Sequence, residues 1–285
     1  MSQDYAASLV ACLGQPVREN PTGVMQEAAF QALGLNWRYL TIEVPAARLR
    51  DAIAGVRALG MRGANLTIPH KVAVLEHLDR IEPDASLIGA VNTVRREGDQ
   101  LIGENTDGKG FLRGLRAEAG IEPRDQRVVV LGAGGAARAI VTELVLAGAA
   151  DVLVVNRSRG RGEQMAAELA RKTGGPIRFE AWSGLYRVPR SADLLVNATS
   201  VGLYPDVDAI PPVDFSDARA GLLVSDAVPN PPDTTLLKKA RGLGFRVLDG
   251  LSMLVQQGTI GFRMWTGVEA PEAVMKDALR RAFAA

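Results

Sequence analysis

The feature of this sequence that most constrains its fold is a series of short apolar runs separated by segments with helical periodicity. Continuous apolar strands are typical of parallel sheets that are covered on both faces. Helical patterns follow the first two runs and precede the last. Strands alternating with helices predict an α/β protein with a parallel sheet. The runs are RVVVL (127–131), DVLVV (151–155), DLLVN (193–197), LLVSDA (222–227) and FRVLD (245–249).

A similar pattern, in which a helix is followed by a glycine and a strand, is present earlier in the chain. Residues 46–59 have helical periodicity, Gly60 is expected to end the helix, and GANLTI (63–68) is typical of a strand. One helical face carries the apolar positions Leu49, Ile53, Val56 and Leu59.

These patterns predict more than one unit. Residues 109–249 are the candidate for a nucleotide-binding unit, and residues 1–108 form a different α/β unit. Residues 250–285 have helical patterns that allow packing on either unit.

Composition excludes several classes of function. The chain has 33 Lys and Arg against 32 Asp and Glu and a net charge of +1, so we expect no nucleic-acid partner. Its single cysteine, Cys12, cannot form an internal disulfide, and no Cys/His cluster has the spacing of a metal site. The first residues do not resemble a signal peptide, and no apolar run reaches the roughly 20 residues that span a bilayer. We therefore expect a cytoplasmic protein with no metal and no membrane partner.

A glycine turn follows the first apolar run, in RVVVLGAGGAARAI. Gly132, Gly134 and Ala137 occupy the three positions of the dinucleotide-binding pattern, between a predicted strand and a predicted helix. The alternative is an ordinary tight turn. The context favours a pyrophosphate site at the helix N-terminus. The residues of this loop are Gly132, Ala133, Gly134, Gly135 and Ala136.

The end of the next run indicates which dinucleotide is bound. NAD-binding versions carry an acidic residue there, but VLVVNRSRGR has none. Asn156, Arg157 and Ser158 stand in its place, with Arg161 close behind. An arginine at this point pairs with a 2′-phosphate, which favours NADP and leaves NAD possible. The alternative is a solvated basic loop.

Polar residues gather in the first half of the chain, beginning with NLTIPHK (65–71). A lysine and an aspartate together can move a proton, and amides and hydroxyls can bind a polyhydroxylated small molecule. The alternative for the lysine is ordinary surface exposure, and His70 and His77 are expected to be structural. The residues are Asn65, Thr67, Lys71, Asn92 and Asp107.

The motifs resemble those of the shikimate dehydrogenase family, in order along nearly the whole chain. The family pattern N-x-T-x-P-x-K is matched by 65–71, V-N-T by 91–93, N-T-D-G by 105–108 and G-A-G-G-A by 132–136. The patterns N-R-T-x-x-R, N-A-T-S-x-G and D-G-x-x-M-L-V-x-Q resemble 156–161, with Ser158 for threonine, 197–202 and 249–257.

The resemblance implies reversible, NADP-linked reduction of 3-dehydroshikimate to shikimate. It implies Lys71 and Asp107 as the catalytic pair, and a Rossmann-like domain, 109–249, inserted into a substrate domain made of 1–108 and 250–285. Substrate contacts would come from Asn65, Thr67, Asn92 and Gln257. Further cofactor contacts would come from Thr199, Ser200, Val228, Gly250 and Met253.

Two departures from the family pattern fall at one end of the substrate. The family binds the substrate carboxylate with a Ser-x-Ser pair, where this chain has Asn20 and Thr22, and with a tyrosine, where it has Pro229. We therefore expect substrate contacts from Asn20 and Thr22 and a related ring acid as substrate, such as quinate or an amino-shikimate. Arg18 and Asn230 are the candidates for a replacement donor. The alternative keeps shikimate as the substrate, with water or nearby groups compensating.

Other classes of function stay open on the sequence alone. One is a dehydrogenase for another substrate, such as a folate-linked methylene dehydrogenase, against which NTDG and MLVQQ argue. Another is a non-catalytic NADP-binding regulator. We expect a small cyclic hydroxy acid as ligand, and a monomer or homodimer.

Overall fold

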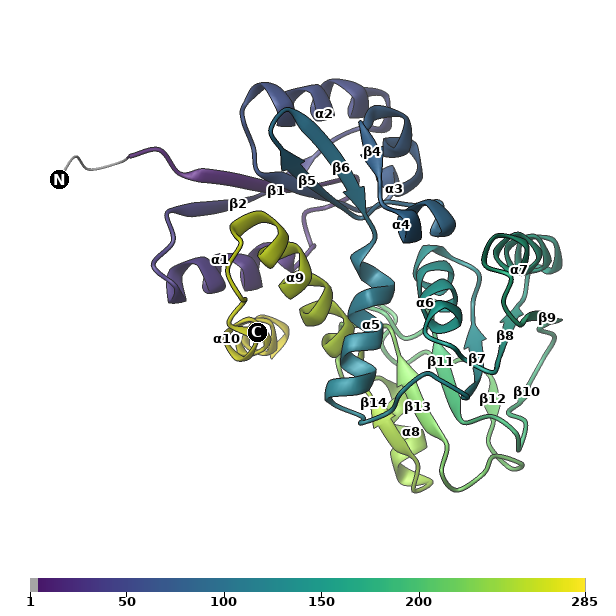
Figure 1. Ribbon diagram of the computed structural model, residues 1–285. Coiled ribbons are helices and arrows are strands. Elements are labelled where there is room, and N and C mark those ends of the chain that lie inside the picture. The colour runs from purple at the N-terminus through teal and green to yellow at the C-terminus, as the bar shows by residue number, and fades with distance from the viewer. Residues whose placement is uncertain (1–4, 285) are drawn as a thin grey trace. The chain divides into compact units, whose positions relative to one another are not determined.

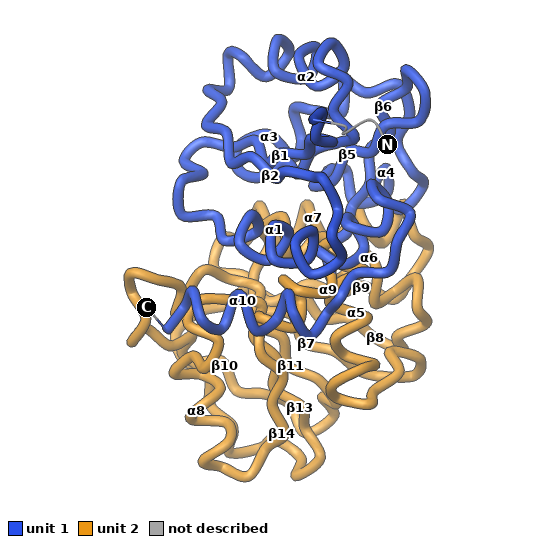
Figure 2. The backbone as a smooth tube through the Cα atoms, turned by 90° about the vertical axis from the view of Figure 1, so that its left-hand side faces the viewer, with its two compact units in different colours: residues 1–106, 257–285 blue, residues 107–256 orange. Residues whose placement is uncertain are grey.

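The structure, a computed structural model, describes residues 5–284 and has two compact units (Figure 2). Unit 1 comprises Met1–Thr106 and Gln257–Ala285, and unit 2 comprises Asp107–Gln256. The division falls in the first turn of α5 (Thr106–Ala117) and inside α9 (Gly250–Thr266), a few residues from the boundaries expected from the sequence. Both units contain helices and parallel strands, so the predicted α/β fold class is confirmed.

Unit 1 contains a six-stranded mixed sheet in the order β2-β1-β3-β5-β6-β4 (Figure 1). The first three strands are parallel, whereas β5 runs antiparallel to β3 and to β6. The strands are β1 (Ser8–Gly14), β2 (Trp37–Glu43), β3 (Gly63–Leu66), β4 (Arg80–Ile81), β5 (Thr93–Glu97) and β6 (Gln100–Glu104).

The C-terminal helix α10 (Glu272–Ala284) lies beside α1 (Thr22–Ala32) in unit 1 (Figure 1). The end of α9 also belongs to this unit: Phe262 stacks on Phe30, with ring centroids 5.3 Å apart. The short helices of unit 1 are η1 (Ala46–Arg48), α2 (Leu49–Ala58), α3 (His70–Ala73), η2 (Val74–His77) and α4 (Pro83–Ile88). No helix in the part of the chain that the structure describes is long and apolar enough to cross a membrane.

The helix predicted over 46–59 is present, but one of its four core positions is wrong. Leu49, Ile53 and Val56 are buried on one face, whereas Leu59 is 72% exposed. Leu59 is the C-cap of α2, and the chain then turns away at Gly60, whose φ is +65°. A leucine at a helix end can satisfy the helical period and still point into solvent.

The segment around Lys71 is helical and not extended. Strand β3 ends at Leu66, and both residues begin the short helix α3. His70 is buried, and its Nε2 lies 2.8 Å from the carbonyl oxygen of Val44. The structural role predicted for His70 is therefore confirmed.

Unit 2 contains a six-stranded sheet, all parallel, in the order β14-β13-β11-β7-β8-β9 (Figure 1). Every apolar run singled out in the sequence is a strand of this sheet. The strands are β7 (Arg127–Leu131), β8 (Asp151–Asn156), β9 (Ile177–Ala181), β11 (Leu194–Asn197), β13 (Leu223–Asp226) and β14 (Arg246–Leu248), with a separate pair β10 (Tyr186–Arg187) and β12 (Val213–Asp214).

Both faces of this sheet are buried, as continuous apolar strands require. Along β7, Val128 and Val130 join one apolar cluster, whereas Val129 and Leu131 join another on the opposite face. The first cluster includes side chains of α5, α6 (Gly135–Leu146) and α7 (Arg159–Thr173), and the second includes side chains of α8 (Thr235–Gly242). The carboxyl ends of the strands are thereby held rigidly at one edge.

Candidate active site and cofactor loop

The glycine loop after β7 has the geometry of a phosphate-binding turn. Gly132 has φ +112°, and a Cβ there would lie 2.9 Å from the carbonyl oxygen of Ala198, so only glycine fits. A Cβ on Gly134, by contrast, would meet no atom within 4 Å. Helix α6 begins at Gly135, and its N-cap Gly134 has no side chain to cap the free N–H groups. The loop therefore leaves open space and unsatisfied donors where a pyrophosphate would lie.

The end of β8 presents free positive charge. The Asn156 amide donates to the carbonyl oxygen of Ser158 at 2.9 Å, which fixes the turn into α7. Arg157 and Arg161 are exposed on this turn, and neither has an ion-pair partner among the residues described. Guanidinium groups at this position fit the 2′-phosphate of NADP better than the ribose hydroxyls of NAD.

A buried network supports the carboxyl ends of β11 and β13. Asn197 donates to Asp226 Oδ1 at 3.0 Å and accepts from the Thr199 hydroxyl at 2.6 Å. Asp226 also accepts from the Val228 N–H at 3.0 Å and from the Thr234 hydroxyl at 2.8 Å. Burial raises the pKa of Asp226 to about 6, and these hydrogen bonds limit the rise. Asp226 was not among the residues expected from the sequence, where it appeared only as part of an apolar run.

The remaining residues expected to contact the cofactor lie on the same side of unit 2. A Cβ on Gly250 would overlap the carbonyl group of Val228, which only glycine avoids. Ser200 is exposed, and Met253 packs against the core cluster that contains β7. Thr199, Val228 and Gly250 are therefore close together beyond the carboxyl ends of the strands, the edge at which parallel α/β sheets bind ligands.

In unit 1, the predicted amides form one continuous wall. Asn65 donates to the Thr93 hydroxyl at 2.9 Å and to the Asn92 carbonyl at 3.2 Å. Asn92 donates to the Thr106 hydroxyl at 3.0 Å and accepts from the Thr106 N–H at 2.7 Å. Thr106 in turn donates to Gln257 Oε1 at 3.4 Å. Asn65, Asn92 and Gln257, which lie far apart in sequence, are thus brought together by β3, β5 and the starts of α5 and the unit-1 part of α9.

Tyr39 extends this wall to Thr22, and no sequence pattern had indicated it. The Tyr39 hydroxyl donates to Asn65 Oδ1 at 2.7 Å, and it also hydrogen bonds with Thr22 and Cys12. Burial raises the pKa of Tyr39 well above its usual range, so this group is a neutral phenol. Burial raises the pKa of Cys12 to about 11, an effect that the Tyr39 hydrogen bond and the positive charge of Lys71 oppose. Lys71 is therefore close enough to influence this cluster.

Other predicted residues lie around this wall without completing it. The Asn20 Oδ1 accepts from the Thr22 N–H at 3.0 Å, and Thr67 packs against Gly14, where a Cβ would overlap it. Lys71 lies in unit 1 and Asp107 is the first residue of unit 2, so their pairing stays a prediction.

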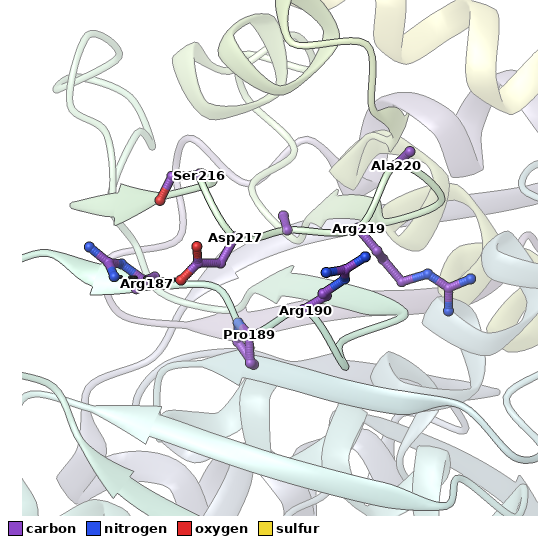
Figure 3. A pocket seen from close by; sticks show the side chains of 8 residues that line it. Arg187, Pro189, Arg190, Ser216, Asp217, Arg219 and Ala220 are labelled. Carbon is purple, nitrogen blue, oxygen red and sulfur yellow. Dashed lines mark ion pairs between the residues drawn. The ribbon is translucent and has the colours of Figure 1, made fainter.

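A separate hollow in unit 2 does not belong to the site (Figure 3). It lies before β11 and β13, at the opposite edge of the sheet from the glycine loop. Arg187 lies 3.5 Å from Asp217, and Arg219 pairs with Asp193, so two of its three arginines have acidic partners. The described residues contain no group of three His, Cys, Asp or Glu side chains that could hold a metal ion.

Family models cover most of the chain. Residues 12–94 match the shikimate dehydrogenase substrate binding domain, and residues 116–204 match the shikimate/quinate 5-dehydrogenase model. Residues 250–280 match the shikimate 5′-dehydrogenase C-terminal domain. The matched segments correspond to both units described above.

Individual relatives are similar over nearly their full length. A shikimate dehydrogenase (NADP(+)) of Methanopyrus kandleri is 46% identical over 98% of this chain and 97% of its own. The ligand-free 5-ketofructose reductase of Gluconobacter sp. strain CHM43 has a TM-score of 0.94 and 46% identity, covering 98% of this chain and 100% of its own. The shikimate 5-dehydrogenase of Thermus thermophilus, solved with NADP(H) and shikimate, has a TM-score of 0.84 and 39% identity, covering 96% and 99%.

Proposed function

The chain belongs to the shikimate dehydrogenase family, and we propose that it reversibly reduces a ring ketone to a secondary alcohol with NADPH. It is an oxidoreductase, and the first candidate pair is 3-dehydroshikimate and shikimate. The single observation that carries the proposal within the structure is the wall of Asn65, Asn92 and Gln257, continuous through buried hydrogen bonds. A wall of neutral donors and acceptors suits a polyhydroxylated ring.

The cofactor is NADP, and its reduced form, NADPH, supplies the hydride for the carbonyl carbon when it is bound. The loop 132–136 would hold the pyrophosphate on the N-terminus of α6, and Arg157 and Arg161 would hold the 2′-phosphate. Thr199, Val228 and Gly250 would shape the remaining part of this site. NAD stays a weaker alternative because no acidic residue follows β8.

Lys71 and Asp107 are the proposed proton-transfer pair. As the ketone is reduced, negative charge grows on its oxygen, and the Lys71 ammonium stabilises that charge and delivers a proton. Asp107 would orient the lysine or return its proton. Thr67, Asn92 and Gln257 would hold the ring hydroxyls, with Asn65 Oδ1 as a further acceptor, so that the reacting carbon is fixed.

An initial-rate assay tests this proposal. Purified protein is given shikimate or quinate, each with NADP and with NAD, and Lys71→Ala is compared with Lys238→Ala, a change of an exposed lysine on α8. We expect Lys71→Ala to lower kcat by about 10²- to 10⁴-fold, with NADPH affinity unchanged, and Lys238→Ala to behave like the parent. A Lys71→Ala variant of near-parental kcat would contradict the role of Lys71.

A second candidate substrate is 5-ketofructose. The reductase that acts on it is as similar to this chain as the M. kandleri shikimate dehydrogenase, at 46% identity. The observation that favours it is the replacement of the family's carboxylate-binding pattern by Asn20, Thr22 and Pro229. The same assay, run with 5-ketofructose and NADPH, measures this activity directly.

The remaining predictions concern other substrates, a non-catalytic role, the oligomeric state and the location of the protein. Quinate or an amino-shikimate as substrate is a proposal that the same assay addresses. Binding of NADPH without turnover of any ring alcohol or ketone would instead support a non-catalytic regulator. A monomer or homodimer and a cytoplasmic location stay predictions, and light scattering of the purified protein measures the first.

A further inference from the structure

The start of α1 is where this chain departs from the Ser-x-Ser pattern, and its polar groups are already used within the protein. The Asn20 Oδ1 accepts from the Thr22 N–H at 3.0 Å, which closes a turn around Pro21. The Thr22 side chain is only 4% exposed. The Asn20 oxygen and the Thr22 side chain therefore do not project freely, as a hydroxyl pair that binds a ligand would.

The hydrogen bonds of this region have one direction, from Thr22 through Tyr39 to Asn65. Tyr39 donates its single hydrogen to Asn65 Oδ1 at 2.7 Å, so its oxygen can only accept, from the hydroxyl of Thr22 and the thiol of Cys12. Asn65 uses both amide hydrogens, one on the Thr93 hydroxyl and one on the Asn92 carbonyl. Because the phenol of Tyr39 is neutral and buried, this order is fixed. The Thr22 hydrogen is committed to Tyr39 and is not offered to a bound carboxylate.

Two cations of unit 1 could replace those donors, and both have other roles. Arg18, the cation nearest in sequence, has a side chain that is 89% exposed and lies 3.3 Å from Glu43. Lys71 is the proposed partner of the reacting carbonyl oxygen. What Asn20 still offers is a neutral amide N–H group, since only its oxygen is used in the turn. Such a group suits a hydroxyl or carbonyl oxygen, whereas a carboxylate without donors is costly to desolvate.

We infer that the substrate is uncharged at the end that faces Asn20 and Thr22, and that the enzyme selects a neutral polyhydroxylated ketone over a ring carboxylate. The inference rests on the proposed function, because it concerns the same site, and it favours the second candidate substrate, 5-ketofructose, over 3-dehydroshikimate. It assigns Asn20, Thr22 and Tyr39 as residues that determine specificity. Tyr39 acts through Thr22 and Asn65, so it is a positioning residue.

Shikimate and methyl shikimate form a matched pair of probes, since they share the ring and its hydroxyls and differ in charge. Both are titrated by calorimetry into the protein saturated with NADPH, where an alcohol cannot react because both partners are reduced. We expect the ester to bind about tenfold or more tightly than the acid. Binding of the acid as tight as that of the ester, or failure of the ester to bind, would overturn the inference.

Two variants test which residues are responsible. Asn20→Ser combined with Thr22→Ser restores hydroxyl donors, and we expect it to shift the ratio of the two dissociation constants at least fivefold toward the acid. Tyr39→Phe removes the acceptor of the Thr22 hydrogen and should shift the ratio in the same direction. Asn36→Ser, the same substitution at an exposed position of unit 1, should leave the ratio unchanged. An unchanged ratio in both test variants, each still folded by circular dichroism, would remove the assignment of these residues.

Binding and turnover separate the two proposals. If the inference is wrong, the ratio of the two dissociation constants favours the acid, while turnover is intact. If the proposed function is wrong, no ketone or alcohol tested is turned over, or Lys71→Ala keeps full activity. The ratio of dissociation constants is measured by binding alone and does not depend on either result.

Discussion

Among single residues, the buried carboxyl group of Asp226 has the clearest consequence for pH dependence. Burial raises its pKa from 3.8 to about 6 in the folded protein. The folded state therefore binds more protons than the unfolded state between these values, and stability falls as the pH rises through this window. The full effect is on the order of 3 kcal/mol, since one pKa unit corresponds to about 1.4 kcal/mol.

Asp226→Asn tests this dependence, because an amide has nearly the same shape and does not titrate. Between pH 4.5 and 7.5 the parent should lose about 2 kcal/mol of unfolding free energy relative to the variant, measured by urea denaturation. Asp208→Asn, at an exposed position, should follow the parent at both pH values. Parallel pH profiles for the parent and Asp226→Asn would contradict the raised pKa.

Cys12 is expected to be inert in the folded protein. It is the chain's single cysteine, it is buried in β1, and burial raises the pKa of its thiol to about 11. Because the thiolate is the reactive form, a disulfide reagent at pH 8 should label it at the rate at which unit 1 opens. Labelling in urea supplies the control for full reactivity. Labelling of the native protein as fast as that of the unfolded chain would show the prediction to be wrong.

Site residues that belong to a sequence motif were predicted, whereas a residue that reaches the site only through the packing of strands was not. Asn65, Asn92 and Gln257 were identified by their motifs, and the structure joins them through Thr106. Tyr39 lies 26 positions from Asn65, in an edge strand with no motif, so nothing in the sequence indicated their hydrogen bond. A contact that depends on the register of neighbouring strands cannot be seen before the sheet is known.

Among elements, the turn between β7 and α6 needs glycine for two different reasons: Gly132 for the backbone conformation and Gly134 for the proposed approach of the cofactor. Gly134→Ala adds a methyl group that meets no protein atom, so unfolding free energy should change by less than about 0.5 kcal/mol while NADPH affinity falls. Gly132→Ala is strained by its φ of +112° and by the Ala198 carbonyl, and should cost about 1–3 kcal/mol. Urea denaturation and fluorescence titration with NADPH measure the two effects. Equal NADPH affinity for Gly134→Ala and the parent would argue against pyrophosphate binding at this turn.

Strands were predicted where they are apolar and continuous, and missed where they are short or half-exposed. The buried strands β7, β8 and β11 stand out because both of their faces are covered. Strand β9 alternates between partly buried and exposed residues at the edge of the sheet, and β10 is only 2 residues long. Such elements take their form from their neighbours, and their own composition is not decisive.

For the whole molecule, the division into two units predicts a local response to cofactor. The glycine loop, Arg157 and Gly250 all lie in unit 2. At a concentration of about 100 times its Kd, NADPH should stabilise the folded state that binds it by about 2.7 kcal/mol. Hydrogen exchange should therefore slow mainly in peptides from 107–256, whereas NADH at equal concentration and the Arg157→Gln variant should show less protection. Slowing confined to peptides from 1–106 would contradict this placement of the cofactor site.

Unit 1 is assembled from two stretches of chain that are separated by all of unit 2. A ribosome delivers residues 107–256 before residues 257–285, so unit 2 has its complete sequence first. Until the last stretch emerges, Phe30 lacks Phe262 and Met25 lacks the backbone at Gly258 against which it packs. Each newly made molecule thus carries an uncovered apolar face on unit 1 until residues 257–285 have been made, and that face is where a chaperone would be needed most.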